Sequence, residues 1–580
     1  MAAHRKHRLA LAASAGLDAL GVRLRATPFR LGPLEPRMPD GLGLIPRDLR
    51  TGDPTIASDL YRGAFSLGGI RVDTDARSPF VITPPNSFWR DELLGFSWLR
   101  HLRAADNDIS RLHARALILD WINLQHKTRG ASGDIAVLSR RMISWLSHAP
   151  LFLDDAEPEF YQKAMKSFGQ QLRTLGREAA SAPEGYPRLL AAIAYCFAAL
   201  CLNGQEKLLQ RAEQQLEKQL EYQILPDGGH ISRHPGTGME LLLDLLPLRQ
   251  TFSGRDMAPP QKLLSAIDRM MPMVRFFRHG SGDFALFNGM GATNPGDTAA
   301  VLALDDTQGR PILNAQHSGY QRMEAGKSLV LMDAGAPPPA GVSRHAHAGC
   351  LSFELSSAQH RIVTNCGAPF ALGENWREAA RSTAAHSTCT VENRSSCEFL
   401  TGRLARLTGP IISSGPENVR VNRDEAGSET VIEASHDGYL KAFGTIHVRR
   451  LRLSTAGGLL DGEDRLTHAS SRHPVKATRQ MNAVLRFHLH PRITASLTDD
   501  NQAVTLVLPN HEGWRFSAIG HRPELEESIF LASAKGPQPT TQIIIPITWS
   551  REIVVKWSFR RTSAGASSLM HVRPKPSGEE

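Results

Sequence analysis

The chain has 580 residues, 41% of them hydrophobic and 22% charged, which is the composition of a folded globular protein. This composition excludes a disordered chain and a fibre, and the length predicts about two to four domains because single hydrophobic cores stop growing well before this size. The 67 Lys and Arg residues against 58 Asp and Glu residues give a formal net charge of +9, which favours anionic partners.

The distribution of charged and apolar residues narrows the choice of partner. No run reaches the ~18 consecutive apolar residues of a membrane-spanning helix, so no membrane span is expected. No dense run of Lys and Arg is interleaved with aromatic residues, so no nucleic-acid partner is expected. An acidic polysaccharide is the remaining anionic partner, and a solvated face with a mild excess of cations is the alternative. Residues 1–21 open like a secretory signal, but Asp18 interrupts their apolar stretch, so they are interpreted as a soluble helix.

The six cysteines show no paired spacing. None of them forms a Cys-x-x-Cys motif, which excludes a structural zinc ribbon and argues against a dense disulfide framework. We therefore expect free, buried cysteines that pack as small apolar side chains. They are Cys196, Cys201, Cys350, Cys366, Cys389 and Cys397.

Residues 1–300 have the apolar spacing of helices. In residues 205–225 an apolar residue recurs every four positions from Leu208 to Leu220, while Gln and Glu occupy the opposite face. Residues 186–202 are apolar on almost every face, which predicts a buried helix. Pro and Gly clusters separate the segments. The predicted helices span residues 109–125, 134–147, 158–180, 186–202, 205–225 and 261–277.

After residue 310 the period changes to two. Many short segments alternate or are rich in β-branched and aromatic residues, and turn-like sequences separate them without helical patterns between. This pattern predicts a large antiparallel β-sandwich over residues 310–570 that meets the helical domain between about residues 295 and 315. Residues 571–580 are predicted to be a disordered tail. The predicted strands include residues 328–335, 350–357, 360–367, 387–393, 429–435, 446–454, 483–490, 503–509, 514–520, 541–549 and 553–559.

One segment of the strand half, residues 343–369, is rich in side chains that carry chemistry. His345 and His347 precede a predicted strand, and a spacing of two on an extended chain directs both imidazoles to one side. His386 follows in a second strand-like segment, five residues after Arg381. Imidazoles and a guanidinium from separate strands can converge on an anionic substrate or a metal ion. The alternative is that these residues form a polar rim of the sandwich.

This segment resembles the β-domain motif of the heparinase II/III family of bacterial polysaccharide lyases, which reads His-x-His-x-x-x-Leu-Ser-Phe-Glu. Residues 225–235 (LPDGGHISRHP) resemble the Asp-Gly-Gly-His segment of the family's helical domain, and residues 318–326 resemble its entry to the β domain. The resemblance covers most of residues 90–560 and implies an incomplete α/α toroid followed by an antiparallel β-sandwich. The matching β-domain positions are His345, His347, Leu351, Ser352, Phe353, Glu354, Asn365, Cys366, Gly367, Arg381, His386, Ser387 and Thr388.

The resemblance implies β-elimination on a chain that contains uronic acids. The enzyme neutralises the carboxylate, removes the C5 proton and protonates the O4 leaving group, and this chemistry requires no cofactor. By the resemblance His345 matches the catalytic histidine. His347 and His386 match a metal-site pair whose third ligand, usually Asp, is Asn365 here, so a structural zinc ion is possible.

The helical domain departs from the family pattern. The usual Asn-His pair is replaced at Tyr186, and the usual Tyr of a Tyr-His pair is Thr237. The candidates that remain for catalysis or for substrate contact lie in neighbouring segments. They are His230, Arg233, His234 and Tyr320 for catalysis beside His345, and Tyr186 and Arg381 for substrate binding.

Two functions follow from these observations. The first is a heparinase II/III-like lyase that cleaves an acidic polysaccharide in a positively charged cleft between the two halves. The second is an altered relative that binds or scaffolds such a chain without cleaving it. The family is associated with the cell envelope, so the resemblance implies the periplasm, whereas residues 1–21 leave the cytoplasm open. The Gly-rich residues 280–297 lack the Lys of a phosphate loop and are expected to be a loop near the junction.

Overall fold

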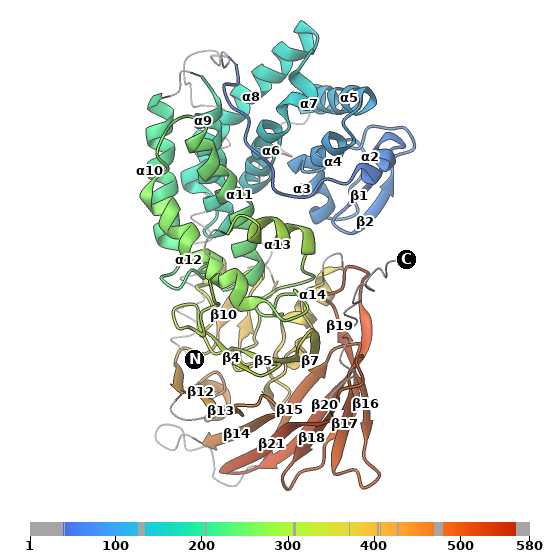
Figure 1. Ribbon diagram of the computed structural model, residues 1–580, viewed down its shortest axis with the longest axis vertical. Coiled ribbons are helices and arrows are strands. Elements are labelled where there is room, and N and C mark those ends of the chain that lie inside the picture. Colours follow the sequence, from blue (N-terminus) through green and yellow to red (C-terminus); the bar gives the residue numbers. More distant parts are fainter. Residues whose placement is uncertain are drawn as a thin grey trace, which may run out of the picture.

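The computed structural model describes residues 39, 41–125, 134–203, 206–305, 309–369, 372–402, 405, 408–425, 429–468 and 480–563. The predicted helix within residues 1–21 and the predicted tail at residues 571–580 lie outside these residues. Among the residues that are described, no helix is long and apolar enough to cross a membrane. Figure 1 shows a helical half and, below it, a half built from strands.

The helical half confirms the six predicted helices. The amphipathic α10 packs against α9, which is buried from Leu189 to Cys201, and α6 covers α9 on another side. These contacts follow from the sequence because an all-apolar helix must be surrounded by others. The helices are α2 (Pro54–Tyr61), α3 (Ser87–Gly95), α4 (Leu99–Ala105), α5 (Asp108–Gln125), α6 (Ile135–Ser147), α7 (Ala149–Leu153), α8 (Pro158–Glu178), α9 (Tyr186–Cys201), α10 (Glu206–Gln223), α11 (Pro235–Ser253), α12 (Gln261–Phe277) and α13 (Pro295–Leu302).

The sequence did not predict a β-hairpin in the helical half. Strands β1 (Ala64–Leu67) and β2 (Ile70–Asp73) pair antiparallel through a turn at Gly68 and Gly69. The hairpin is short and only β1 is largely buried, so the period-two signal is weak there.

The strand half is an antiparallel sandwich, as the sequence predicted. One sheet has the order β11-β12-β13-β14-β21-β18-β17-β16, and the other has the order β19-β20-β15-β7-β6-β5-β4-β3, with β8 paired to β15. The eleven strand segments predicted above coincide with β5, β6, β7, β8, β12, β13, β15, β17, β18, β20 and β21. The described part of this half includes the short helices α14 (Glu374–Arg381) and α16 (Leu440–Phe443).

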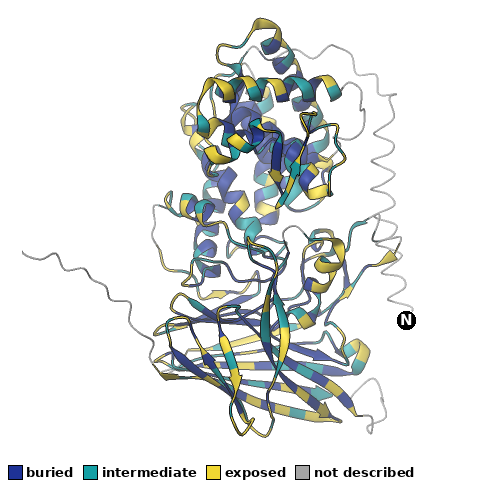
Figure 2. Cartoon of the chain, turned by 90° about the vertical axis from the view of Figure 1, so that its right-hand side faces the viewer, coloured by how far each residue is buried: buried dark blue, intermediate teal, exposed yellow. Residues whose placement is uncertain are grey.

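Burial alternates along the sandwich strands, as the burial colours in Figure 2 show. In the core, Phe353 and Phe487 pack around Trp557 at ring-centroid distances of 5.5 and 4.8 Å. The strand bounds are β3 (Asn314–Ala315), β4 (Tyr320–Ala325), β5 (Ser328–Asp333), β6 (Phe353–Ser357), β7 (His360–Thr364), β8 (Cys389–Val391), β9 (Glu398–Phe399), β10 (Ile412–Ser414), β11 (Val419–Asp424), β12 (Thr430–His436), β13 (Thr445–Leu453), β14 (Leu459–His468), β15 (Met481–Leu489), β16 (Thr494–Leu497), β17 (Ala503–Val507), β18 (Gly513–Ala518), β19 (Glu524–Phe530), β20 (Gln538–Trp549) and β21 (Glu552–Ser563).

The two halves share an apolar junction. Tyr320 of β4, Leu329 and Leu331 of β5 and Phe530 of β19 belong to the same core cluster as the helices. All four residues lie on strands of the β15-containing sheet, so this sheet forms the junction. The last helix of the first half ends at Leu302 and β3 begins at Asn314. All six cysteines are buried and free, as predicted.

Candidate functional site

The loop that carries His345 lies at the junction of the two halves. It follows a short 3-10 turn (Ala340–Val342) and turns through a hydrogen bond from the Ala346 amide to the Ser343 carbonyl. Gly289 of the Gly-rich segment adopts a φ of +92°, and a Cβ there would lie 2.5 Å from the His345 carbonyl oxygen. Only glycine permits that backbone to approach so closely. The segment is therefore a junction loop, as the sequence predicted.

His345 is exposed and its surroundings are cationic. Crowding by protein atoms lowers the pKa of His345 to about 4, and the positive charges of Arg381, Arg344 and Arg377 act in the same direction. The side chain is exposed to solvent, so a ligand can reach it. His345 is consequently a neutral imidazole at pH 7 with cations around it, an arrangement suited to a proton acceptor beside an anionic group.

Arg381 does not reach into solvent as a substrate-binding residue. Its guanidinium is buried and donates to the carbonyl oxygens of Ala346 (2.8 Å), Ser343 (3.0 Å) and Pro410. It also stacks on Phe399 at 4.3 Å. Since Ser343 and Ala346 flank His345, Arg381 fixes the loop that presents His345. The prediction of direct substrate contact is corrected to a positioning role.

His347 and His386 lie together, but His345 does not join them. The Nδ1 of His347 is 3.1 Å from the Nε2 of His386, and both rings are buried. His386 donates its Nδ1 proton to the Ser382 carbonyl, so its Nε2 accepts from His347 in the neutral pair. The prediction that His345 and His347 face one side is wrong because the chain turns at these residues and is not extended.

The predicted metal site lacks a third ligand. The Asn365 amide is turned away from the imidazoles, since its Oδ1 accepts from the Ser387 amide at 2.9 Å and its Nδ2 lies 3.3 Å from Glu354. Across the described ranges no group of three or more His, Cys, Asp or Glu residues is arranged to hold a metal ion. Two imidazoles do not complete the coordination that structural zinc requires, so the residues present do not fit it.

Arg233 ties the helical half to the sandwich. Its buried guanidinium donates to the carbonyl oxygens of Ser318 (2.7 Å), Gly319 (3.1 Å) and Ala336 (2.8 Å) and pairs with Asp333. Every donor position is therefore directed at protein. The prediction of a catalytic Arg233 is corrected, because the side chain holds the junction.

Tyr320 is part of the same buried network. Its hydroxyl donates to the Arg233 carbonyl and accepts from Asn288 Nδ2 at 2.7 Å, and its ring lies 4.7 Å below the Arg233 guanidinium. Burial raises the pKa of this phenol well above its usual range. The residue does not present a hydroxyl to a cleft, so the predicted catalytic and substrate contacts of Tyr320 are corrected.

His230 and His234 both belong to the segment before α11. His230 is buried, with Nε2 2.9 Å from Gln223 Oε1 and Nδ1 2.7 Å from Ser232 Oγ, and burial lowers its pKa to about 3. His230 is therefore occupied inside the protein, which corrects its predicted catalytic role. His234 is partly exposed and caps α11, where its Nδ1 accepts from the Thr237 amide at 3.1 Å.

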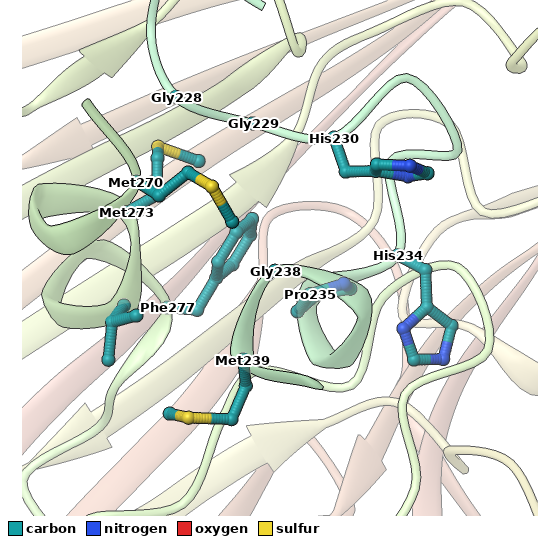
Figure 3. Close-up of a pocket in the computed structure, with 11 residues that line it drawn as sticks. Gly228, Gly229, His230, His234, Pro235, Gly238, Met239, Met270, Met273 and Phe277 are labelled. Carbon is teal, nitrogen blue, oxygen red and sulfur yellow. The ribbon is translucent and has the colours of Figure 1, made fainter. Parts of the chain in front are cut away.

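A small apolar pocket lies beside His234. Figure 3 shows the two imidazoles on one side of it and methionine side chains on the other. It has a volume of about 280 Å³ including the solvent at its mouth. Its walls offer no Lys, Arg, Asp or Glu, so the pocket suits an apolar group and cannot neutralise a carboxylate. The lining residues are Gly228, Gly229, His230, His234, Pro235, Gly238, Met239, Met270, Met273, Val274 and Phe277.

Tyr186 belongs to an ionic cluster of the helical half. Its partly buried hydroxyl accepts from Arg140 Nη2 at 2.9 Å, and Arg140 also pairs with Asp244 at 2.8 Å. Arg50 bridges Asp244 and Glu240, each at 2.8 Å. The two cations and two carboxylates compensate each other, so these four groups add no net positive charge beside Tyr186, whose substrate contact stays a prediction.

Several residues that shape the site were not predicted from the sequence. Asn288 accepts from the His347 amide at 3.3 Å and donates to Asp333 at 3.0 Å, which connects the Gly-rich loop to the junction. The positive charges of Arg344 and Arg377 lower the pKa of His345. No local motif marks the Asn288 contacts, whereas the position of Arg344 next to His345 was a visible signal.

Comparisons with known proteins agree with the fold. The family model described as "Heparinase II/III-like, C-terminal" matches residues 307–558. The chain is 34% identical over 495 residues to "FtsZ-localized protein C" of Caulobacter vibrioides (strain NA1000 / CB15N), covering 84% of each chain.

Solved structures share the architecture at low identity. A crystal structure of heparinase III superposes with a TM-score of 0.67 at 12% identity, covering 86% of this chain and 81% of that one. A mutant of heparan sulfate lyase HepC from Pedobacter heparinus has a TM-score of 0.60 at 15% identity, covering 97% of this chain and 89% of that one. The predicted toroid followed by a β-sandwich is thereby confirmed. The chain belongs to the heparinase II/III-like family, of which it is a divergent member.

Proposed function

We propose that this chain binds an acidic polysaccharide at the face around His345 and cleaves it by β-elimination. The observation that supports the proposal most strongly is the state of His345. Among the three histidines of the β-domain motif, His345 is exposed while His347 and His386 are buried. A neutral, accessible imidazole with arginines nearby has the properties that uronate chemistry needs.

The chemistry can be assigned to few groups. Arg344 or Arg377 pairs with the uronate carboxylate, so that charge developing at C5 delocalises into it. His345 accepts the C5 proton as the C4–O4 bond breaks and the C4–C5 double bond forms. The resulting imidazolium then returns its proton to the O4 oxygen when base and leaving group lie on one face of the ring. One histidine acts in turn as base and acid, which removes the need for a separate tyrosine.

A second function is a binding or scaffolding protein that keeps the fold and does not cleave. The positions of two predicted catalytic residues favour this second function, because His230 and Arg233 make hydrogen bonds inside the protein. The name of the Caulobacter relative also refers to localisation with FtsZ and not to an activity. On this alternative the face around His345 retains a glycan without chemistry.

One assay separates the two functions. The purified chain is incubated with hyaluronan, heparosan, alginate and polygalacturonate, and the far-ultraviolet absorbance of the unsaturated uronate is followed. Rising absorbance on at least one substrate supports the lyase. Binding of a polymer, measured by calorimetry, without any rise in absorbance selects the scaffold. Neither binding nor cleavage of any polymer in the panel contradicts both.

A further inference from the structure

An exposed tryptophan lies on the helix next to the candidate site. The chain has eight tryptophans, and seven of them are buried in the two cores with exposures of 4% or less. Trp376 of α14 is 42% exposed. Trp376 is exposed in a chain that buries every other tryptophan, and it lies on the helix that holds the His345 loop, so it is available to contact a ligand there.

Helix geometry places Trp376 relative to the sandwich. Trp376 precedes the buried Ala380 by one turn, so the two side chains lie on the same side of α14. Ala380 docks against Cys366 and Leu531 of the sandwich. The exposed ring of Trp376 therefore lies on the side of α14 that packs on the sandwich, one turn before the buried part of that side. Figure 1 shows α14 between the helical half and the sandwich.

Direct hydrogen bonds connect α14 to the His345 loop. Arg381, the last residue of the helix, donates to the carbonyl oxygens of Ser343 and Ala346 on either side of His345. Trp376 lies five residues earlier, which is roughly 8 Å along the helix axis at 1.5 Å per residue. That separation is on the order of one or two sugar units. Glu374 and Glu378 of the same helix are exposed carboxylates, so the charge beside the ring is mixed.

We propose that Trp376 is a stacking platform for a pyranose ring of an acidic glycan whose neighbouring carboxylate is held by Arg377 and Arg344 next to His345. One face of a pyranose carries axial C–H groups and packs on an indole, while its hydroxyls stay in water. Arg377 belongs to the same helix as Trp376, and its positive charge acts on His345, so the helix carries both an apolar and a cationic contact near the site. This inference deepens the proposed function and rests on it, since it names the residue that sets the position of the sugar.

The experiment uses the full chain and hexasaccharides of hyaluronan, heparosan and polygalacturonate as probes. Binding is measured by titration calorimetry for wild type, Trp376→Ala, Trp376→Phe and, as a matched control, Ile519→Ala, whose exposed side chain lies on the far sheet. We expect Trp376→Ala to weaken binding about tenfold and Trp376→Phe to recover most of it. The control should bind as wild type does, and all variants should melt as wild type does because both positions are exposed.

A second readout reports the ring itself. Acrylamide should quench the exposed Trp376 in the free chain, and saturating hexasaccharide should protect it, with both effects lost in Trp376→Phe. Binding by wild type that is unchanged in Trp376→Ala overturns this inference and leaves the proposed function standing. A wild-type chain that binds none of the probes contradicts the proposed function, and the platform fails with it.

Discussion

Arg233 and His345 each lie in a segment that resembles a motif of the family, but they differ in what surrounds them. Arg233, Tyr320 and Asn288 direct their polar atoms at protein and lie buried between the two halves. His345 stands exposed on a loop whose backbone is held from below by Arg381. A matching motif residue is thus a candidate for chemistry only where its polar atoms remain available.

The largest loss of stability is expected when Arg233 is replaced. Arg233→Ala leaves Asp333 and several carbonyl oxygens buried without their donor, which should lower the free energy of unfolding by about 3–5 kcal/mol. Urea denaturation of wild type and variant measures the loss. Arg71→Ala is the matched control, because the Arg71–Asp59 pair is half exposed and should contribute less than about 1 kcal/mol. Equal losses for the two variants would show that Arg233 does not hold the junction.

A pH series tests the buried histidines. Burial lowers the pKa of His230 to about 3, that of His386 to about 4 and that of His488 to about 3. The unfolded chain therefore binds protons first, so stability is complete above pH 6.5 and falls as the pH decreases towards 3 to 4. Each histidine should cost about 2 kcal/mol between pH 6.5 and pH 5. Urea midpoints measured across this range should fall, and a flat profile would contradict the burial of these rings.

Replacing Arg381 tests whether this residue positions the loop that carries His345. Arg381→Met removes three hydrogen bonds to carbonyl oxygens, which should cost about 1–3 kcal/mol of stability. It also removes a positive charge near His345, so the pKa of His345 should rise slightly from about 4, while burial, its main cause, keeps it lowered. Proton NMR titration of the His345 ring reports this shift. An unchanged pKa together with an unchanged melting temperature would rule out the positioning role.

The smallest effect on stability is expected at His345. His345→Ala should change the free energy of unfolding by less than about 0.5 kcal/mol, because the side chain is exposed on a loop. If the chain is a lyase, the same change should reduce the rate about 10²- to 10⁴-fold. Full lyase activity in a folded His345→Ala would remove the residue from the mechanism.

Most of the fold could be predicted because periodicity reports burial. Strand β14 was missed because its sequence, LLDGEDRLTH, looks polar, yet Asp464 is buried there. Its carboxylate pairs across the strands with Arg449 and His447 of β13, at 2.8 and 2.7 Å. An alternation pattern counts Asp as an outward residue, and only the partner strand shows why it points inward.

The site was less predictable for a related reason. The motif placed His347 and His386 together, since spacing and family resemblance both point to the pair. Nothing local distinguishes an arginine that binds a ligand from one that binds carbonyl oxygens, so the sequence predicted catalysis for Arg233 and substrate binding for Arg381. The Arg50–Asp244 pair joins residues 194 positions apart, which no pattern in a single sequence reveals.

Histidine modification tests the central claim directly, namely that His345 is accessible to a ligand while the histidines of the junction are buried. Diethylpyrocarbonate at neutral pH reacts with accessible neutral imidazoles, and peptide mass spectrometry locates the products. We predict modification of His345 and of the exposed His511, protection of His230, His347 and His386, and loss of the His345 product alone when a bound acidic hexasaccharide is present. An unreactive His345, or one that the bound glycan does not protect, would contradict the account.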